Sequence, residues 1–339
     1  MFKNLTKNLI YSTLDYSGIN RLFRQKNGKS VLILTYHSVL PYSSRFDEFD
    51  YRNCVSTEAF DAQIKYLKKH YDLITLNEAV ERLNENKLDN IHVVLTFDDG
   101  FKNNYDFALP VLLDNNTSAV FYLSTDFIGK QYMLWTEKVN DIILNTQKTK
   151  LKIHLDKLVD LDLSSIEKRE KASVLVRTYL KFNSINEENR VLGEMTELTG
   201  YDNWAIKKDP DRYDFMTWDE VKKMHQAGME IGSHTHTHTL LNMMDEQNSF
   251  DELSTSKKEI ETNLNTDCNL FSYPNGDKGN FLDIHFEQLK KLGYSCATTQ
   301  LKGYNKPGGN IFALNRMNIT SKMTLPVFKA MVSGSYSLL

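Results

Sequence analysis

The chain has 339 residues, of which 41% are hydrophobic and 25% charged, enough to bury one large α/β domain with an insertion, or two domains. Its 41 Lys and Arg residues nearly balance 44 Asp and Glu residues, and the net charge of −3 argues against an electrostatic nucleic-acid-binding protein. Three cysteines without a C-x-x-C spacing indicate a reducing compartment rather than a disulfide framework.

Residues 1–29 form a predicted N-terminal arm. They lack the sustained apolar run and the small-residue cleavage site of a signal peptide, and no later stretch is long enough to span a bilayer. We therefore predict a cytoplasmic protein. Residues 1–27 mix apolar with basic residues, which favours an arm packed on the domain. Weak peripheral contact of a basic helix with a membrane is the alternative.

Short β-rich runs recur along the chain and predict the strands of a sheet. The runs are Val31–Tyr36, His92–Phe97, Ser118–Leu123, Met229–Ser233, Asn269–Tyr273, Tyr294–Thr298 and Phe312–Ile319. Helical patterns lie between several of them, as in Thr57–His70, and capping boxes begin at Thr75 and Thr217. Strands that alternate with helices predict a largely parallel sheet that is closed, or nearly closed, into a barrel.

Residues 130–215 interrupt this alternation. We predict that they form a mostly helical insertion on the barrel of residues 30–339. Leu151–Leu161 and Glu167–Leu180 are charged and helix-prone, and Lys207–Arg212 is loop-like.

Two polar motifs are the strongest functional signal in the sequence. Thr96-Phe-Asp-Asp-Gly100 ends one predicted strand, and Ser233-His-Thr-His-Thr-His238 follows another, more than a hundred residues later. Because the C-terminal ends of barrel strands meet at one mouth, we expect these side chains to form one site.

Asp99, His234 and His238 offer one oxygen and two nitrogen ligands, a set that suits Zn²⁺ and tolerates Co²⁺, Ni²⁺ or Fe²⁺. Three protein ligands leave positions open for water and substrate, as catalytic metal sites require. Alone, Asp-Asp-Gly would be an ordinary turn and the histidines a solvated loop. Together at strand ends they predict a metal site. His236, between two of the ligands, is expected to point elsewhere and to be structural.

Asp98 is the second carboxylate of the first motif. Beside a metal ligand it could act as a general base toward water. It could also orient a ligand from outside the coordination sphere. The residues alone leave both roles open.

Three motifs resemble those of the polysaccharide deacetylases, the NodB-like enzymes of carbohydrate esterase family 4. They are Thr96–Gly100, Ser233–His238 and Phe271-Ser-Tyr-Pro-Asn-Gly276. The resemblance covers about residues 30–320 except the insertion. It implies a distorted (β/α) barrel of about seven strands and a Zn²⁺-type ion. It also implies a hydrolase that removes an N-acetyl group from an amino sugar of a surface polysaccharide or its precursor.

The resemblance also implies roles for individual residues. Asp98 would be the catalytic base, and the three metal ligands would be those named above. The backbone N–H of Tyr273 would help to hold the oxyanion, and the neighbouring Pro274 would line the substrate site. Trp135 and Tyr132, at the start of the insertion, could stack on a sugar ring, although helix packing explains them equally well.

The sequence departs from the family at the base and at the acid. Ser272 stands where many members have an Arg that orients the base. Arg316 could replace that Arg, and a surface or core salt bridge is an equally good explanation for it.

No Leu-x-x-His motif near the C-terminus supplies the usual acid. Leu34-Thr-Tyr-His-Ser-Val39 resembles an early motif of the poly-N-acetylglucosamine deacetylase branch, in which the histidine is the acid. We therefore predict that His37 is the general acid rather than a buried structural histidine.

Two other functions are compatible with this pattern. Related barrels open cyclic amides or imides, for which a small closed pocket would be expected. A carbohydrate-binding pseudoenzyme would show degenerate ligands, and none of the core positions here is degenerate.

Overall fold

A parallel sheet lies at the centre of the computed structural model, which describes residues 10–338. Seven strands follow one another in the order β11-β10-β9-β6-β5-β1-β12, and the short strand β4 pairs with β5. The strands are β1 (Ser30–Tyr36), β4 (Asp72–Leu73), β5 (Ile91–Phe97), β6 (Val120–Leu123), β9 (Glu230–Ser233), β10 (Leu270–Ser272), β11 (Cys296–Thr298) and β12 (Arg316–Asn318). All seven predicted strands are therefore present.

The two ends of this sheet nearly meet. At one edge β12 pairs with β1, with Ile33 opposite Arg316. Just before β12, Leu314 forms a parallel bridge with Thr298 of β11, which brings the chain back to the other edge. The predicted α/β fold, a nearly closed seven-stranded parallel barrel, is confirmed.

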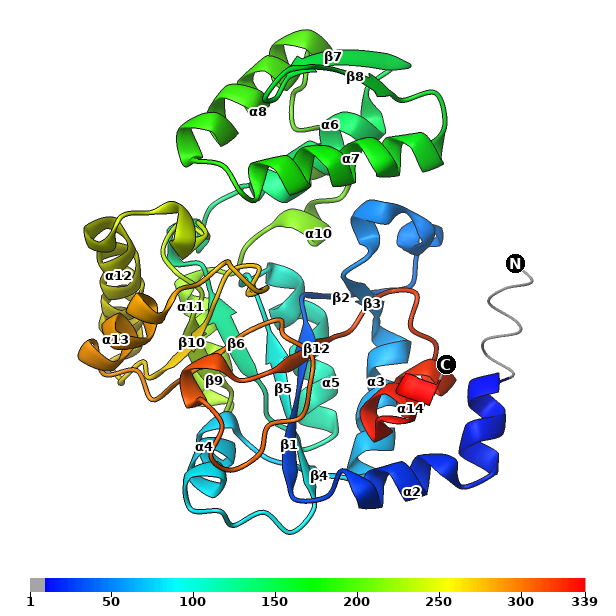
Figure 1. Ribbon diagram of the computed structural model, residues 1–339, viewed down its shortest axis with the longest axis vertical. Helices are drawn as coiled ribbons and strands as arrows, with labels where there is room; N and C mark the ends of the chain where they lie inside the picture. Colours follow the sequence, from blue (N-terminus) through cyan, green and yellow to red (C-terminus); the bar gives the residue numbers. More distant parts are fainter. Residues whose placement is uncertain (1–9, 339) are drawn as a thin grey trace.

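Helices connect the strands and cover the outside of the barrel (Figure 1). They are α3 (Thr57–His70), α4 (Leu76–Asn84), α5 (Leu109–Asp114), α11 (Trp218–Gln226), α12 (Glu246–Leu264), α13 (Asp283–Lys291) and α14 (Leu325–Ser333). Two begin at predicted caps, where the hydroxyls of Thr75 and Thr217 accept hydrogen bonds from backbone N–H groups. Helices thus shield the sheet from water, as an all-parallel sheet requires.

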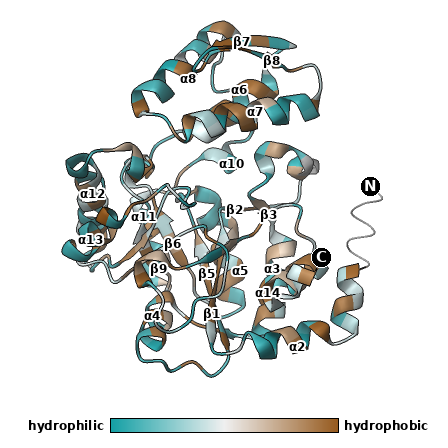
Figure 2. Cartoon of the chain, viewed as in Figure 1, coloured by the Kyte–Doolittle hydropathy of each residue, from teal (hydrophilic) through white to brown (hydrophobic). Residues whose placement is uncertain are grey.

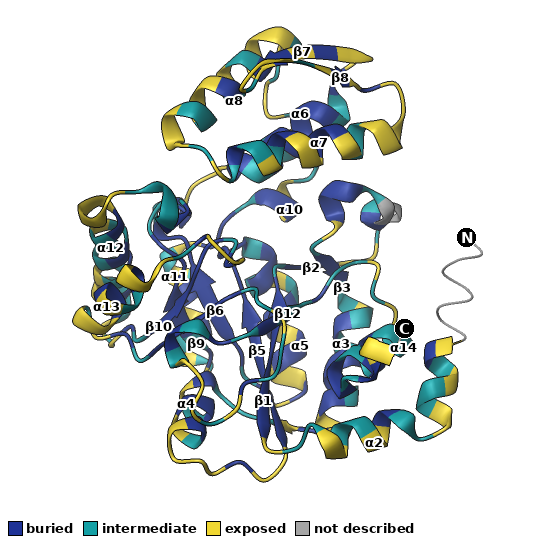
Figure 3. Ribbon diagram, in the orientation of Figure 1, coloured by how far each residue is buried: buried dark blue, intermediate teal, exposed yellow. Residues whose placement is uncertain are grey.

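The strands are buried on both faces (Figure 3). Leu32 and Leu34 of β1 pack in one cluster with α3, whereas Val31 and Ile33 pack in another with α4. Hydrophilic residues gather on α12 and α13, on the outer surface (Figure 2). This double burial explains why the strands read as continuous apolar runs in the sequence.

The predicted insertion lies between β6 and β9 and caps one end of the barrel (Figure 1). It contains α6 (Trp135–Asn145), β7 (Lys150–His154), β8 (Leu158–Asp162), α7 (Ile166–Leu180), α8 (Ile185–Thr199), α9 (Trp204–Lys208) and α10 (Pro210–Tyr213). Most of a second hydrophobic cluster, including Val139, Ile153 and Val191, belongs to the insertion, and Phe49 and Leu240 join it from outside.

Two local predictions within the insertion are wrong. Leu151–Leu161 does not form a helix, because β7 and β8 pair as an antiparallel hairpin. Leu151 and Ile153 are buried between exposed neighbours, so a period of two, rather than the high charge, decides the structure here. Lys207–Arg212 is not a simple loop, since it contains the end of α9 and the start of α10, where Pro210 occupies the first helical turn.

The described part of the N-terminal arm packs on the C-terminal end of the chain. Residues 10–16 are helical and α2 follows (Ile19–Lys26). Tyr11 stacks on Tyr336 at 5.4 Å, and Lys329 forms an ion pair with Asp15 at 2.7 Å. The packed arm is therefore confirmed for these residues, whereas residues 1–9 lie outside the described chain. Membrane contact by residues 1–27 stays a prediction.

Three short features complete the description. Strands β2 (Ser38–Leu40) and β3 (Cys54–Ser56) pair beside the barrel mouth. All three cysteines are buried and unpaired. Among the helices of residues 10–338, none has the length and apolar character needed to cross a membrane.

Candidate metal and catalytic site

The two polar motifs meet at the C-terminal ends of strands that flank β6. Asp98 and Asp99 follow β5 directly, and His234 follows β9 directly. The chain then turns back, with Thr235 and His238 in the left-handed region at φ values of 65° and 59°. The Nε2 atoms of His238 and His234 thereby come within 3.3 and 3.6 Å of Asp99 Oδ1.

Asp99, His234 and His238 form a buried group whose donor atoms all lie within 4.8 Å of one another. His234 donates from Nδ1 to the carbonyl of Ser272 at 2.7 Å, which leaves its Nε2 lone pair on the side of Asp99. Burial lowers the pKa of His234 to about 4, so its imidazole is neutral, the form that binds metals. This set of ligands fits a divalent ion of the Zn²⁺ class.

The backbone of the first motif is held in an uncommon conformation. Asp99 has a φ of 80° and Gly100 a φ of 91°. A side chain at position 100 would also approach side-chain carbons of Ile128 and Leu123 at 3.1 and 3.2 Å. Left-handed backbone costs a non-glycine residue about 1–2 kcal/mol, and such strain is typical of functional sites. The turn directs the Asp99 carboxylate to the two histidines.

Asp98 forms a bidentate ion pair with Arg316. Nη1 and Nη2 of Arg316 donate to the two carboxylate oxygens, each at 2.7 Å, and both side chains are buried. Burial alone would raise the pKa of Asp98, but the charge and hydrogen bonds of Arg316 hold it below its usual range. Asp98 is therefore ionised beside the metal ligands.

Three further residues, of which only Thr299 lacks a sequence signal, complete the contacts of Arg316. Its Nε donates to the carbonyl of Thr299 at 2.8 Å, Nη1 to the hydroxyl of Thr96 at 3.1 Å and Nη2 to the hydroxyl of Ser272 at 2.8 Å. All five N–H donors of the guanidinium thus have a partner. The small Ser272, which is a departure from the family, is an acceptor for the Arg that reaches Asp98 from β12.

A further residue without a sequence signal holds the histidine loop. The carboxylate of Glu252, on α12, accepts hydrogen bonds from the backbone N–H groups of His236 and Thr237 at 2.8 and 2.9 Å. The ring of His236 lies 2.9 Å from the hydroxyl of Thr125 and forms no contact with the metal group. Its structural contacts agree with the role that we expected.

His37 follows β1 and reaches the same mouth. The carbonyl of Tyr36, the preceding residue, accepts a hydrogen bond from the backbone N–H of Asp98 at 3.1 Å, so His37 and Asp98 follow the paired ends of β1 and β5. The Nδ1 of His37 is buried and has no partner among the described residues. The structure thus brings His37, Arg316 and Asp98 together with the three metal ligands, although their catalytic roles remain proposals.

The predicted substrate contacts receive less support. The N–H of Tyr273 donates to the carbonyl of Thr298 at 3.1 Å, so the sheet already uses the group that we assigned to the oxyanion. Its ring is buried against Phe281. Pro274 is also buried, and its contact with substrate stays a prediction.

The rings of Trp135 and Tyr132 are engaged in packing. Trp135 is only 7% exposed and belongs to the hydrophobic cluster of the insertion. Tyr132 stacks on Phe127 at 4.4 Å, and the Nζ of Lys138 lies over its ring, also at 4.4 Å. Trp135 is therefore buried by packing, whereas Tyr132 is 37% exposed, and sugar stacking by either ring stays a prediction.

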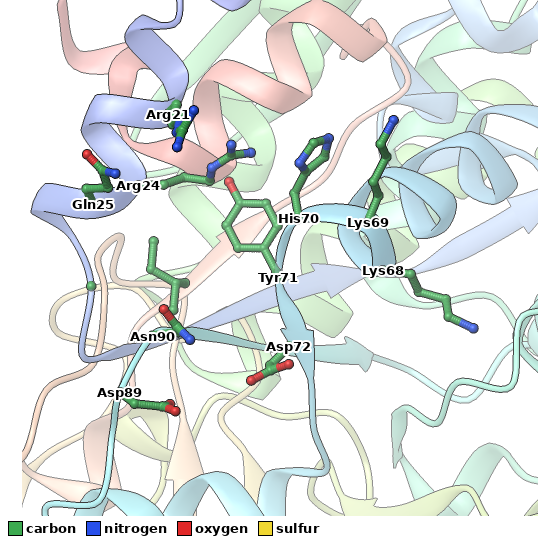
Figure 4. Close-up of a pocket in the computed structure, with 12 residues that line it drawn as sticks. Arg21, Arg24, Gln25, Lys68, Lys69, His70, Tyr71, Asp72, Asp89 and Asn90 are labelled. Carbon is green, nitrogen blue, oxygen red and sulfur yellow. The ribbon is translucent and has the colours of Figure 1, made fainter.

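A separate cavity of about 590 Å³ lies at the N-terminal ends of the strands (Figure 4). Its lining includes Arg21 and Arg24 of α2 and Lys68, Lys69 and His70 at the end of α3. Gly28 and Ile91, next to the starts of β1 and β5, also line it. It is therefore at the other end of these strands from Asp98 and is not part of the catalytic mouth.

Comparisons with known proteins agree with this fold. Over 304 residues the chain is 22% identical to YxkH of Bacillus subtilis (strain 168), a protein named as a proposed polysaccharide deacetylase, covering 89% of this chain and 76% of YxkH. The structure superposes on the Streptococcus pyogenes deacetylase PplD with a TM-score of 0.60 at 18% identity. This match covers 90% of the present chain and 98% of PplD. For IcaB from Ammonifex degensii the TM-score is 0.58 at 17% identity, and the match covers 92% of the present chain and 98% of IcaB.

A family model described as polysaccharide deacetylase matches residues 85–297, more than half of the chain. The match spans the Asp-Asp-Gly motif, the histidine motif and the insertion between them. The chain therefore belongs to the polysaccharide deacetylase family.

Proposed function

We propose that this protein is a metal-dependent N-deacetylase that acts on an N-acetylated amino sugar of a surface polysaccharide or its precursor. The family implies an acetylated polysaccharide as substrate. The observation that carries the proposal is the buried Asp98–Arg316 pair beside the cluster of Asp99, His234 and His238. The PplD structure was determined with acetate, the product expected here.

The cluster supplies the site for the ion. Asp99, His234 and His238 would hold it, with Zn²⁺ as the first choice and Co²⁺, Ni²⁺ or Fe²⁺ as alternatives. When bound, the ion would polarise the acetamido carbonyl and make water a nucleophile at neutral pH.

Asp98 is suited to be the general base. It is ionised, and Arg316 holds both carboxylate oxygens in one orientation. In the proposed reaction a water oxygen attacks the carbonyl carbon, and its proton passes to Asp98. Arg316 is a positioning residue, since it touches the base rather than the substrate.

His37 is suited to be the general acid. As the bond between the carbonyl carbon and nitrogen breaks, the protonated imidazole would give its proton to the leaving nitrogen, which departs as an amine. Acetate is the second product. The position of His37 directly after β1, whose last residue pairs with the end of β5 before Asp98, supports this assignment.

Mass spectrometry of N-acetylated oligosaccharides, and of nucleotide- and lipid-linked amino sugars, tests the proposal directly. We expect the Zn²⁺-loaded protein to remove one acetyl mass from at least one of them and Asp98→Asn to remove none. Asp106→Asn, a change at an exposed carboxylate paired with Lys102, is the matched control and should retain activity. Opening of a cyclic imide without acetate release would favour the amidase alternative. Binding without turnover would favour a pseudoenzyme.

A further inference from the structure

The first turn of α6, in the insertion, is anchored to the loops that carry the metal ligands. Leu134 packs in a buried cluster with Phe101, two residues after the first ligand. Trp135 packs in a second cluster with Leu240, two residues after the last ligand. The start of α6 is therefore fixed beside both motifs, although it belongs to the insertion.

Glu137 lies on the same helical face as Leu134, one turn further along. Its side chain is 10% exposed. Oε1 forms an ion pair with Arg212 Nη2 at 2.7 Å, but Oε2 is buried and has no partner among the described residues. Nε and Nη1 of Arg212 are likewise buried without a partner. A buried carboxylate oxygen without a partner is unfavourable, because no hydrogen bond offsets the loss of its hydration.

The pKa of Glu137 is consistent with this position at the start of α6. Burial raises the pKa of Glu137 to about 7 against the opposing charge of Arg212, and the charge of Asp99 raises it further. These influences agree with the packing that anchors α6 beside the two metal ligands.

We propose that Glu137 is a substrate-binding residue supplied by the insertion, whose free Oε2 accepts a hydrogen bond from a sugar hydroxyl while the acetamido group lies at the metal centre. Arg212 holds the other oxygen and keeps the carboxylate in place. The inference rests on the proposed deacetylase function and gives the insertion a role in choosing a sugar over a small acetyl compound. The competing explanation is a buried ion pair that only holds the insertion on the barrel.

The test compares two substrates in the metal-loaded full-length protein. With an N-acetylglucosamine oligomer, Glu137→Gln should lower kcat/KM roughly 10- to 100-fold, the effect of losing a hydrogen bond to a charged group. With 4-nitrophenyl acetate, which has no sugar, its activity should stay within about twofold of wild type. Asp141→Asn is the matched control, since Asp141 is buried on the same helix but accepts from Asn145. It should leave the ratio between the two substrates unchanged.

A binding measurement separates this inference from the proposed function. Calorimetry with the same oligomer compares Asp98→Asn with Asp98→Asn/Glu137→Gln, and we expect about tenfold weaker binding in the double variant. Unchanged oligomer binding and kinetics, or an equal loss on both substrates with a lower Tm, would show that the pair is only structural. If wild type releases no acetate but the binding difference persists, the deacetylase proposal fails and Glu137 remains a sugar-binding residue.

Discussion

Arg316 donates from both terminal nitrogens to the two oxygens of Asp98, although the two residues are 218 positions apart in the chain. Neither side chain is accessible to solvent to more than 3%. A buried bidentate pair fixes the direction of the carboxylate as well as its charge. The base of the proposed reaction is therefore positioned by the strand that closes the barrel.

Arg316→Lys should keep a positive charge but lose the bidentate geometry. We expect kcat for the N-acetylated substrate to fall roughly 100-fold, with the metal content unchanged. Arg316→Ala should also lower the free energy of unfolding by about 3–5 kcal/mol, because it leaves Asp98 buried without its partner. Kinetics and urea denaturation measure the two effects. Arg190→Lys, on the exposed face of α8, is the control. Full activity in Arg316→Lys would contradict a positioning role.

His37→Ala should act mainly on the step that expels the amine. We expect kcat for the acetamido substrate to fall about 10²–10⁴-fold, the range for loss of a general acid. Hydrolysis of 4-nitrophenyl acetate should change much less, because a nitrophenolate leaves without a proton. Steady-state kinetics on both substrates give the comparison. An equal loss on both would assign His37 to another task, such as orienting Asp99.

Removal of the metal should abolish activity. Substitutions of the histidines in the second motif should differ in their effect on metal content. EDTA treatment followed by Zn²⁺, Co²⁺ or Ni²⁺ should restore turnover. The bound ion should raise Tm, since it binds only the folded chain. His234→Ala should lose the ion as measured by elemental analysis. His236→Ala should retain it, because His236 contacts Thr125 rather than the metal group. Loss of metal in both variants would contradict this set of ligands.

His285 should make stability depend on pH. It is buried, it accepts a hydrogen bond from the N–H of Leu282 at the start of α13, and burial lowers its pKa from 6.5 to about 4. Folding therefore favours the neutral ring. The contribution of the neutral His285 ring to the free energy of unfolding is complete above pH 6.5 and is lost as the pH falls toward 4. Between pH 8 and pH 5 we expect a loss of about 2 kcal/mol in the free energy of unfolding.

His285→Asn keeps an acceptor but cannot titrate, so its stability should fall by less over the same range. Urea denaturation at both pH values measures the difference. The same pH dependence in variant and wild type would show that other groups, such as His234, account for it.

Much of the fold and of the metal group could be predicted from local sequence patterns. Apolar runs and helix caps give the strands and helices because these elements depend on neighbours in the chain. The motifs that end β5 and begin after β9 indicate one site because strand ends in a parallel barrel share a mouth. The hairpin at Leu151 was missed because high charge obscured a two-residue period.

The sequence by itself therefore determined the barrel, the family resemblance and the Asp99, His234 and His238 group. Only the tertiary structure decided that Arg316 pairs with Asp98 and that the N–H of Tyr273 is used within the sheet. Only it placed the first turn of α6, in the insertion, beside the loops that carry the metal ligands. The physical reason is that a buried charge or N–H group takes its partner from whichever segment folds against it. Closure of β12 on β1 and the docking of α6 are long-range contacts that no local pattern contains.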